Sequence, residues 1–158
     1  MAITLQGFFT NSYNTFKTTI NSSVTDPKTN KISSKRRWIY RDFPDTTSFD
    51  FSGYPLIHIN HVDFNDDEII VLSDNYRDNT ITIDLDVYAE FDDENGRNDI
   101  VSSSVLEALF DSDNVTTLEG IGLFTPRIVN TSTTNTVIES KRVVLRSFRI
   151  SYIIEVSS

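Results

Sequence analysis

Three carboxylates fall on one side of a predicted strand, and they are the residues of this chain best placed for chemistry. Asp84, Asp86 and Glu90 recur at even spacing within residues 80–91, and side chains two apart on a strand point the same way. Carboxylates grouped like this hold divalent cations in metal-dependent nucleases and hydrolases. The other interpretation is the solvated or subunit-facing side of an amphipathic strand. We favour the second, and predict neither a metal ion nor a cofactor.

The two histidines, His58 and His61, do not provide an obvious catalytic centre. On a regular strand their spacing places them on opposite faces, so they converge on one metal only if the strand bends at Asn60. The many Ser and Asp residues allow a Ser-His-Asp triad on paper, but no Gly-x-Ser-x-Gly motif selects one of them. We therefore predict structural or surface histidines and no enzyme.

Three other motifs resemble known ligand-binding sequences only in part. Residues 92–96 resemble part of an EF-hand loop, but Phe91 and Ser102 occupy its first and twelfth ligand positions. Gly120-x-Gly122 lacks the rest of a dinucleotide fingerprint. The basic run that contains Arg36 and Arg37 precedes Trp38 and is typical of a solvated strand entry or of a contact with a partner.

Composition restricts the partners. The 158 residues fit one domain, their net charge is −9, and there is no cysteine. The chain therefore has no disulfide or thiolate chemistry, and its acidity disfavours general binding to nucleic acid or anionic membrane. Neither a signal peptide nor an apolar run of about 20 residues is present, so we expect a soluble protein made in the cytoplasm.

Hydrophobic periodicity predicts the elements that position these residues. Apolar side chains at spacings of three and four predict a helix over about 3–22, followed by a solvated linker over about 25–35. Alternation predicts strands over 36–43, 55–60, 68–72 and 80–91, joined as an antiparallel meander. A helix over about 99–110, a bent edge strand over 118–130, a hairpin tip over 131–136 and a central strand over 142–156 complete the chain.

These elements predict an α+β fold. We expect a single domain over 1–158, in which a mostly antiparallel sheet of five to six strands, over about 36–156, packs with the N-terminal helix and one internal helix. The loop over 45–53 carries Phe49 and Phe51, which we expect to tuck into the core.

Several short motifs occur in the same order as these elements. They are Tyr40-x-Asp42-Phe43-Pro44, Tyr54-Pro55-Leu56-Ile57-His58-Ile59, Ile81-x-Ile83-x-Leu85-x-Val87-Tyr88-Ala89, Val105-Leu106-x-Ala108-Leu109 and Arg142-Val143-Val144-Leu145-Arg146-x-Phe148. In this order, over roughly residues 1–156, the chain resembles the tail terminator, or tail completion, proteins of long-tailed bacteriophages and tailed archaeal viruses. The family has no catalytic residue to carry over.

The resemblance implies a structural virion protein, assembled in the host cytoplasm. Such a protein forms a homo-oligomeric ring, commonly a hexamer, that caps the tail tube, stops its polymerisation and joins it to the connector or neck, while viral DNA passes through the lumen without specific binding. A closed ring needs two different complementary patches on each subunit. The alternatives are a neck or head-completion adaptor, a tail-tube subunit or, in another class, a metal-dependent nuclease or hydrolase.

We expect the interface residues on exposed strand faces and polar loops. The candidates lie on the polar face of residues 80–90, in the 45–53 loop, in the 125–140 hairpin and in the basic run; they are Thr82, Asp84, Asp86, Tyr88, Glu90, Phe49, Phe51, Arg127, Thr133, Asn135, Arg36 and Arg37.

Overall fold

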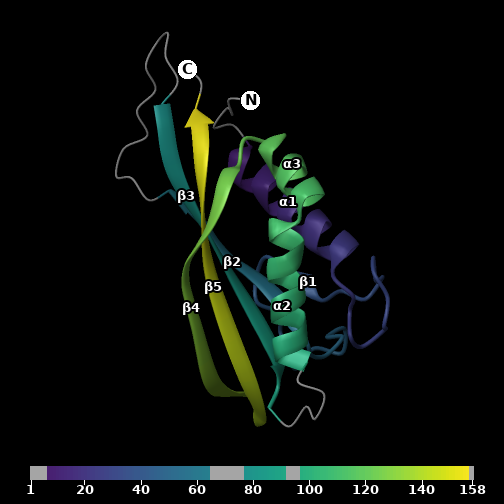
Figure 1. Cartoon of the computed structure of the whole chain (residues 1–158). Helices are drawn as coiled ribbons and strands as arrows, with labels where there is room; N and C mark the ends of the chain where they lie inside the picture. Colours follow the sequence, from purple (N-terminus) through teal and green to yellow (C-terminus); the bar gives the residue numbers. More distant parts are fainter. Residues whose placement is uncertain (1–6, 65–76, 92–96, 157–158) are drawn as a thin grey trace.

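The structure is a computed structural model that describes residues 7–64, 77–91 and 97–156. Along the chain these residues form α1 (Phe8–Ser23), β1 (Ile39–Tyr40), β2 (Leu56–Phe64), β3 (Arg77–Glu90), α2 (Arg97–Phe110), α3 (Ser112–Glu119), β4 (Phe124–Ile138) and β5 (Lys141–Val156). The expected α+β fold with an N-terminal helix is confirmed (Figure 1).

The described strands form one sheet in the order β1-β2-β3-β5-β4. Every pairing is antiparallel except that of β1 with β2, which is parallel. The sheet is therefore mostly antiparallel, as expected, but its first two strands do not form a meander. The segment between β1 and β2 is long enough to cross back, and a parallel neighbour requires such a connection.

The three helices lie on one face of the sheet, where the main core is buried (Figure 1). The buried residues of α1 fall at helical spacing, which places Phe8, Ser12, Phe16 and Ile20 on one stripe. The ring of Phe16 meets that of Tyr152 edge-on at 5.7 Å between centroids. From the sheet come the alternating residues Ile81, Ile83, Leu85 and Val87 of β3 and Phe148, Ile150, Tyr152 and Ile154 of β5. Packing rather than propensity thus holds α1, as its Thr- and Asn-rich sequence predicts.

A second, smaller cluster lies on the opposite face at one end of the sheet. Its buried members are Tyr40, Tyr54, Leu56 and Val143, and the partly buried Phe51, Tyr88 and Ile138 pack against them. The central strand β5 therefore carries apolar residues on both faces at this end, as its mixed pattern predicts.

The region after α2 differs from the expected single helix. The Asp111 carboxylate accepts hydrogen bonds from the backbone N–H groups of Asp113 and Asn114 and starts a second helix, α3. Leu118 is therefore the buried end of a helix rather than the start of a strand, and the turn through Gly122, with φ of 92°, leads into β4.

The hairpin between the last two strands is longer than expected. The predicted tip over 131–136 is wrong, because these residues are paired with β5 within β4. The chain reverses instead at Glu139 and Ser140, whose φ values of 48° and 66° fit a two-residue turn that follows the twist of the strands. β4 is an edge strand, as predicted.

Three further expectations can be compared with the structure. The strand expected over 36–43 is confined to Ile39–Tyr40. Phe49 does not tuck into the core, since its side chain is fully exposed, whereas Phe51 is half-buried against Tyr54. The strand expected over 68–72 and the EF-hand-like run over 92–96 lie outside the described residues.

Candidate functional site

The polar side of β3 lies on the face opposite the helices, and its five candidate residues differ in exposure. Thr82 and Asp86 are buried, Asp84 and Tyr88 are half-buried, and Glu90 is exposed. The polar face of β3 is thus covered in part by the neighbouring residues of its own chain. Its exposed end is at Glu90, whose carboxylate pairs with the Lys141 ammonium at 3.1 Å.

Asp86 connects three strands of the sheet. Its carboxylate accepts a hydrogen bond from the Ser147 hydroxyl of β5 at 2.6 Å and one from the Asn60 side-chain amide of β2 at 3.1 Å. Nδ1 of His58 lies 3.8 Å from the same carboxylate, and Nε2 donates to the Arg41 carbonyl at 3.0 Å. Asp86 therefore fixes the register of β2, β3 and β5 on this face.

Asp84 is paired with an arginine of the neighbouring strand β5. Arg149, opposite Asp84 in the β3–β5 register, donates to both carboxylate oxygens at 2.8 and 3.0 Å. This hydrogen bonding raises the pKa of the Arg149 guanidinium further above its already high value. Arg146, three residues earlier on β5, turns instead to Asp99 of α2 on the helix side.

The alternative of a metal centre gains no support from this geometry. Both carboxylates already accept hydrogen bonds from their neighbours, and in the part of the chain that the structure describes no three His, Asp or Glu residues gather as ligands. The strand does bend at Asn60: a bulge between Ile59 and His61 places His61 opposite Asp84, just as His58 is opposite Asp86. The side chain of His61 lies outside the description.

An aromatic corner borders this face. The ring of Phe43 meets those of His58 and Tyr88 edge-on, with centroids 5.8 and 5.0 Å apart. Burial, with the nearby Asp86 charge, raises the pKa of Tyr88 to about 12. Beside the corner a shallow hollow is lined by Arg37, Tyr40, Asp42, Phe43, Pro44, Asp45, Ser48, Asp50 and Phe51. It offers both aromatic and acidic contacts to a partner.

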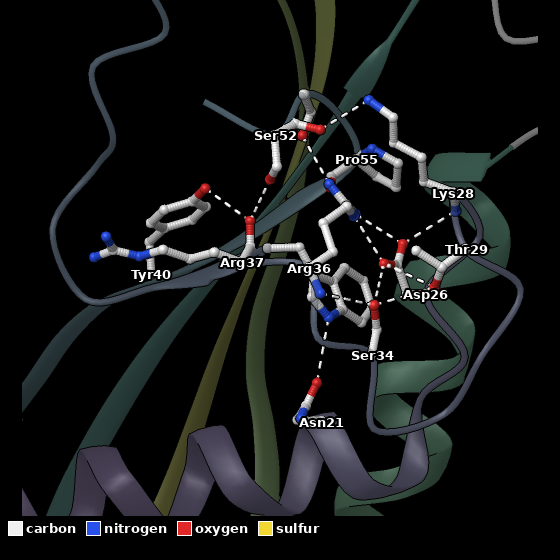
Figure 2. Close-up of polar contacts among 12 residues, drawn as sticks. Asn21, Asp26, Lys28, Thr29, Ser34, Arg36, Arg37, Tyr40, Ser52 and Pro55 are labelled. Carbon is white, nitrogen blue, oxygen red and sulfur yellow. Dashed lines mark hydrogen bonds and ion pairs between the residues drawn. The ribbon is translucent and has the colours of Figure 1, made fainter. Parts of the chain in front are cut away.

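Arg36 is not a surface contact, contrary to expectation, but the centre of an internal network (Figure 2). Its guanidinium forms two hydrogen bonds with the buried Asp26 carboxylate, at 2.7 and 2.8 Å, and donates to the carbonyls of Gly53 and Pro55. The pair is almost completely shielded from solvent. Arg36 therefore joins the turn at Asp26, which precedes β1, to the segment at Gly53 and Pro55, which follows β1.

Asp26 collects further donors, so the predicted solvated linker is an ordered turn at this point. The backbone N–H of Lys28 and the hydroxyls of Thr29 and Ser34 all donate to its carboxylate. Burial alone raises the pKa of Asp26, but the hydrogen bonds from Arg36, Lys28 and Ser34 outweigh it and leave the pKa below its ordinary value. Lys28 also reaches the Ser52 carbonyl at 2.8 Å (Figure 2).

Arg37, next to this network, remains on the surface. Its guanidinium lies over the ring of Tyr40 at 5.2 Å, and its carbonyl accepts hydrogen bonds from Tyr40 and Ser52 (Figure 2). Of the two candidates in the basic run, Arg36 and Arg37, only Arg37 is exposed and lines the hollow.

The β4–β5 hairpin presents three of the expected candidates in one exposed run. Arg127, Thr133 and Asn135 belong to a run, from 127 to 135, in which every residue of β4 is exposed. Thr133 accepts a hydrogen bond from Arg146 at 3.3 Å. Because a strand with one buried face shows alternating burial, the uniform exposure of this run indicates a part of the sheet that nothing in the described chain covers.

Sequence reasoning missed Asp26, and a signal for it existed. An Asp-Pro pair within a polar, Lys-containing segment is typical of a turn, and only the burial of Asp26 distinguishes it from a solvated one.

Among the described helices, none is long and apolar enough to cross a membrane. Neither a scan against models of known protein families nor a search of curated proteins finds a match to this chain.

Proposed function

We propose that this protein is a structural virion component: a ring-forming tail terminator that caps the tail tube, stops its polymerisation and joins it to the connector or neck. The proposal starts from the order of the short sequence motifs, which resembles that of tail terminator proteins.

The observation that carries the proposal is the uncovered hairpin. A strand of 15 residues, exposed along its middle on both faces, contributes little to the core of its own chain. Large surfaces that are ordered yet uncovered are typical of subunits that assemble. We assign the hairpin to one ring contact and the exposed Phe49 to the other.

The acidic balance has a role in this assembly. Asp42, Asp45 and Asp50 surround the hollow, and clustered carboxylates repel phosphate over a Debye length of about 8 Å at physiological salt. An acidic lumen lets DNA pass without adhering. If replacing these three residues by Lys left DNA retention and ejection unchanged in assembled particles, they would not line the lumen.

The proposal is tested by native mass measurement and negative-stain imaging of the purified protein, alone and mixed with tail tubes of the virus that encodes it. Rings seated at one end of each tube are expected. Incorporation along the tube identifies a tube subunit instead, rings that bind only connectors identify a neck adaptor, and metal-dependent cleavage of DNA abolished by Asp84→Asn identifies a nuclease.

A further inference from the structure

The outer edge of β4 is not protected against pairing with another strand. Among the described strands β4 is paired only with β5, and in Figure 1 its lower half runs along the border of the molecule. Natural edge strands are usually guarded by charges, proline, bulges or short length. β4 has Pro126 and a bulge near Val129 at its start, but from Asn130 to Ile138 it has no proline, no charge and no bulge.

The sequence of this edge is close to self-complementary when read backwards. From 127 to 139 it reads Arg-Ile-Val-Asn-Thr-Ser-Thr-Thr-Asn-Thr-Val-Ile-Glu. If a second copy pairs antiparallel with Thr133 opposite Thr133, then Asn130 meets Thr136 and Thr131 meets Asn135. Polar residues thus meet polar ones over the regular stretch, and just beyond it, at the bulge, Val129 comes near Val137.

The ends of this register are complementary in charge. Arg127, before the bulge, comes near Glu139 of the other copy, in the hairpin turn, and the two-fold symmetry repeats the pair at the far end. Directly opposed side chains of opposite charge stabilise an antiparallel pair, and like charges destabilise it. The chain as a whole carries −9, so two copies repel each other in general, but no like charges meet along this edge.

The exposed side chains agree with the register. Val129 and Val137 are 58% and 65% exposed, unusually open for two valines in one strand. Pairing places them against each other at the two ends of a polar centre of Thr, Ser and Asn, and β-branched residues such as Thr and Val favour cross-strand contact.

We infer that β4 is a self-pairing edge, through which two copies of this chain join antiparallel to form one continuous sheet. The contact is isologous and closes after two copies, so it yields a dimer rather than a ring. The inference does not depend on the virion function. The dimer covers the hairpin of the free protein and therefore competes with any ring contact made there.

Disulfide trapping tests the register, because the chain has no cysteine of its own. Thr133→Cys lies on the two-fold axis, so we expect a covalent dimer on mild oxidation at low protein concentration. Thr131→Cys is the matched control in the same strand. In this register residue 131 of one copy lies opposite residue 135 of the other, so the two introduced cysteines are four residues apart along the strand. This variant should stay largely monomeric. The double variant Thr131→Cys/Asn135→Cys should cross-link again.

Charge variants test the contact in solution by sedimentation velocity without tubes. Thr133→Glu places two carboxylates opposite each other across the two-fold axis, so we expect the dimer dissociation constant to rise by about tenfold or more. Asn14→Glu on the exposed side of α1 adds the same charge and should change nothing. Arg127→Glu and Glu139→Arg should each weaken the dimer, and the double swap should restore it.

The inference is overturned if the chain is monomeric at all accessible concentrations, if Thr131→Cys cross-links as readily as Thr133→Cys, or if the double charge swap is no better than its parents. None of these results depends on ring formation at a tube, so failure of the dimer and failure of the proposed virion function are separately visible.

Discussion

Asp26 and Arg36 determine how the loops around β1 are held. The carboxylate of Asp26 is completely buried and meets Arg36 through two hydrogen bonds, while the same guanidinium reaches the carbonyls of Gly53 and Pro55. One side chain thereby joins segments that are far apart in the sequence. Sequence reasoning could recognise the turn at Asp26-Pro27 but could not pair it with Arg36, because an ion pair between separate loops leaves no periodic signal.

Replacing Asp26 by Asn should strongly destabilise the fold. The variant leaves the Arg36 guanidinium buried without its counter-ion, and breaking such a pair costs about 3–5 kcal/mol. The free energy of unfolding from urea denaturation measures the loss. Asp50→Asn, at an exposed site, is the control and should change the same quantity by no more than about 0.5 kcal/mol. Equal effects of the two variants would show that Asp26 is an ordinary surface carboxylate.

The Asp26 ion pair also predicts a pH dependence. The folded-state pKa of Asp26 is below its ordinary value of 3.8, so its stabilising contribution is complete above that pH and is lost as the pH falls through the lower, folded-state pKa. The difference in unfolding free energy between wild type and Asp26→Asn should therefore be constant near neutrality and shrink below about pH 4. A difference that grew on acidification would contradict the assignment.

At the scale of the element, the clean alternation in β3 could be predicted, whereas the second half of β4 could not. β3 carries Ile81, Ile83, Leu85 and Val87 on one face, and all four are buried. β4 has a run of Thr, Ser and Asn that is typical of a loop, yet it is a strand because it pairs residue by residue with β5. The missed helix α3 is equally polar, and its only strong local signal is the capping Asp111.

Variants of Asp111 and Asp113 distinguish the hydrogen bonds that cap α3 from the effect of a negative charge near the start of the helix. Asp111 accepts two backbone hydrogen bonds at the start of the helix, whereas Asp113 lies in the first turn. Asp111→Ala should lower the free energy of unfolding by about 1 kcal/mol, and Asp113→Ala by a few tenths, about the effect of one charge on the helix dipole. Thermal unfolding of both variants compares them. The reverse order would mean that α3 is not capped as described.

The whole molecule separates residues that hold the fold from residues that are free to meet a partner. Helices cover one face of the sheet around Phe16 and Tyr152, and a small cluster around Tyr54 covers one end of the other face. The hairpin and Phe49 are not covered by any part of the chain that the structure describes. This division could be predicted for the helix side from periodicity, but not for Phe49, because two aromatics in a loop give no sign of which one packs.

Substitutions of two phenylalanines should separate an effect on assembly from an effect on stability. Phe16→Ala removes a completely buried ring and should cost about 3–5 kcal/mol of unfolding free energy. Phe49→Ala removes a fully exposed ring and should leave stability unchanged, while reducing the fraction of tube ends that carry a ring in negative-stain images. If Phe49→Ala lowers the free energy of unfolding, the phenyl side chain of Phe49 packs against the fold. If the variant still forms oligomeric rings at tube ends, Phe49 lies outside the contact between subunits.

The proposed capping activity is tested most directly by the growth of the tube itself. Tail-tube subunits are allowed to polymerise, this protein is added at intervals, and the tube lengths are measured by electron microscopy. We predict that elongation stops on addition and that the arrested tubes carry one ring at one end. Tubes that continue to lengthen at the same rate with saturating protein present would contradict the proposed function.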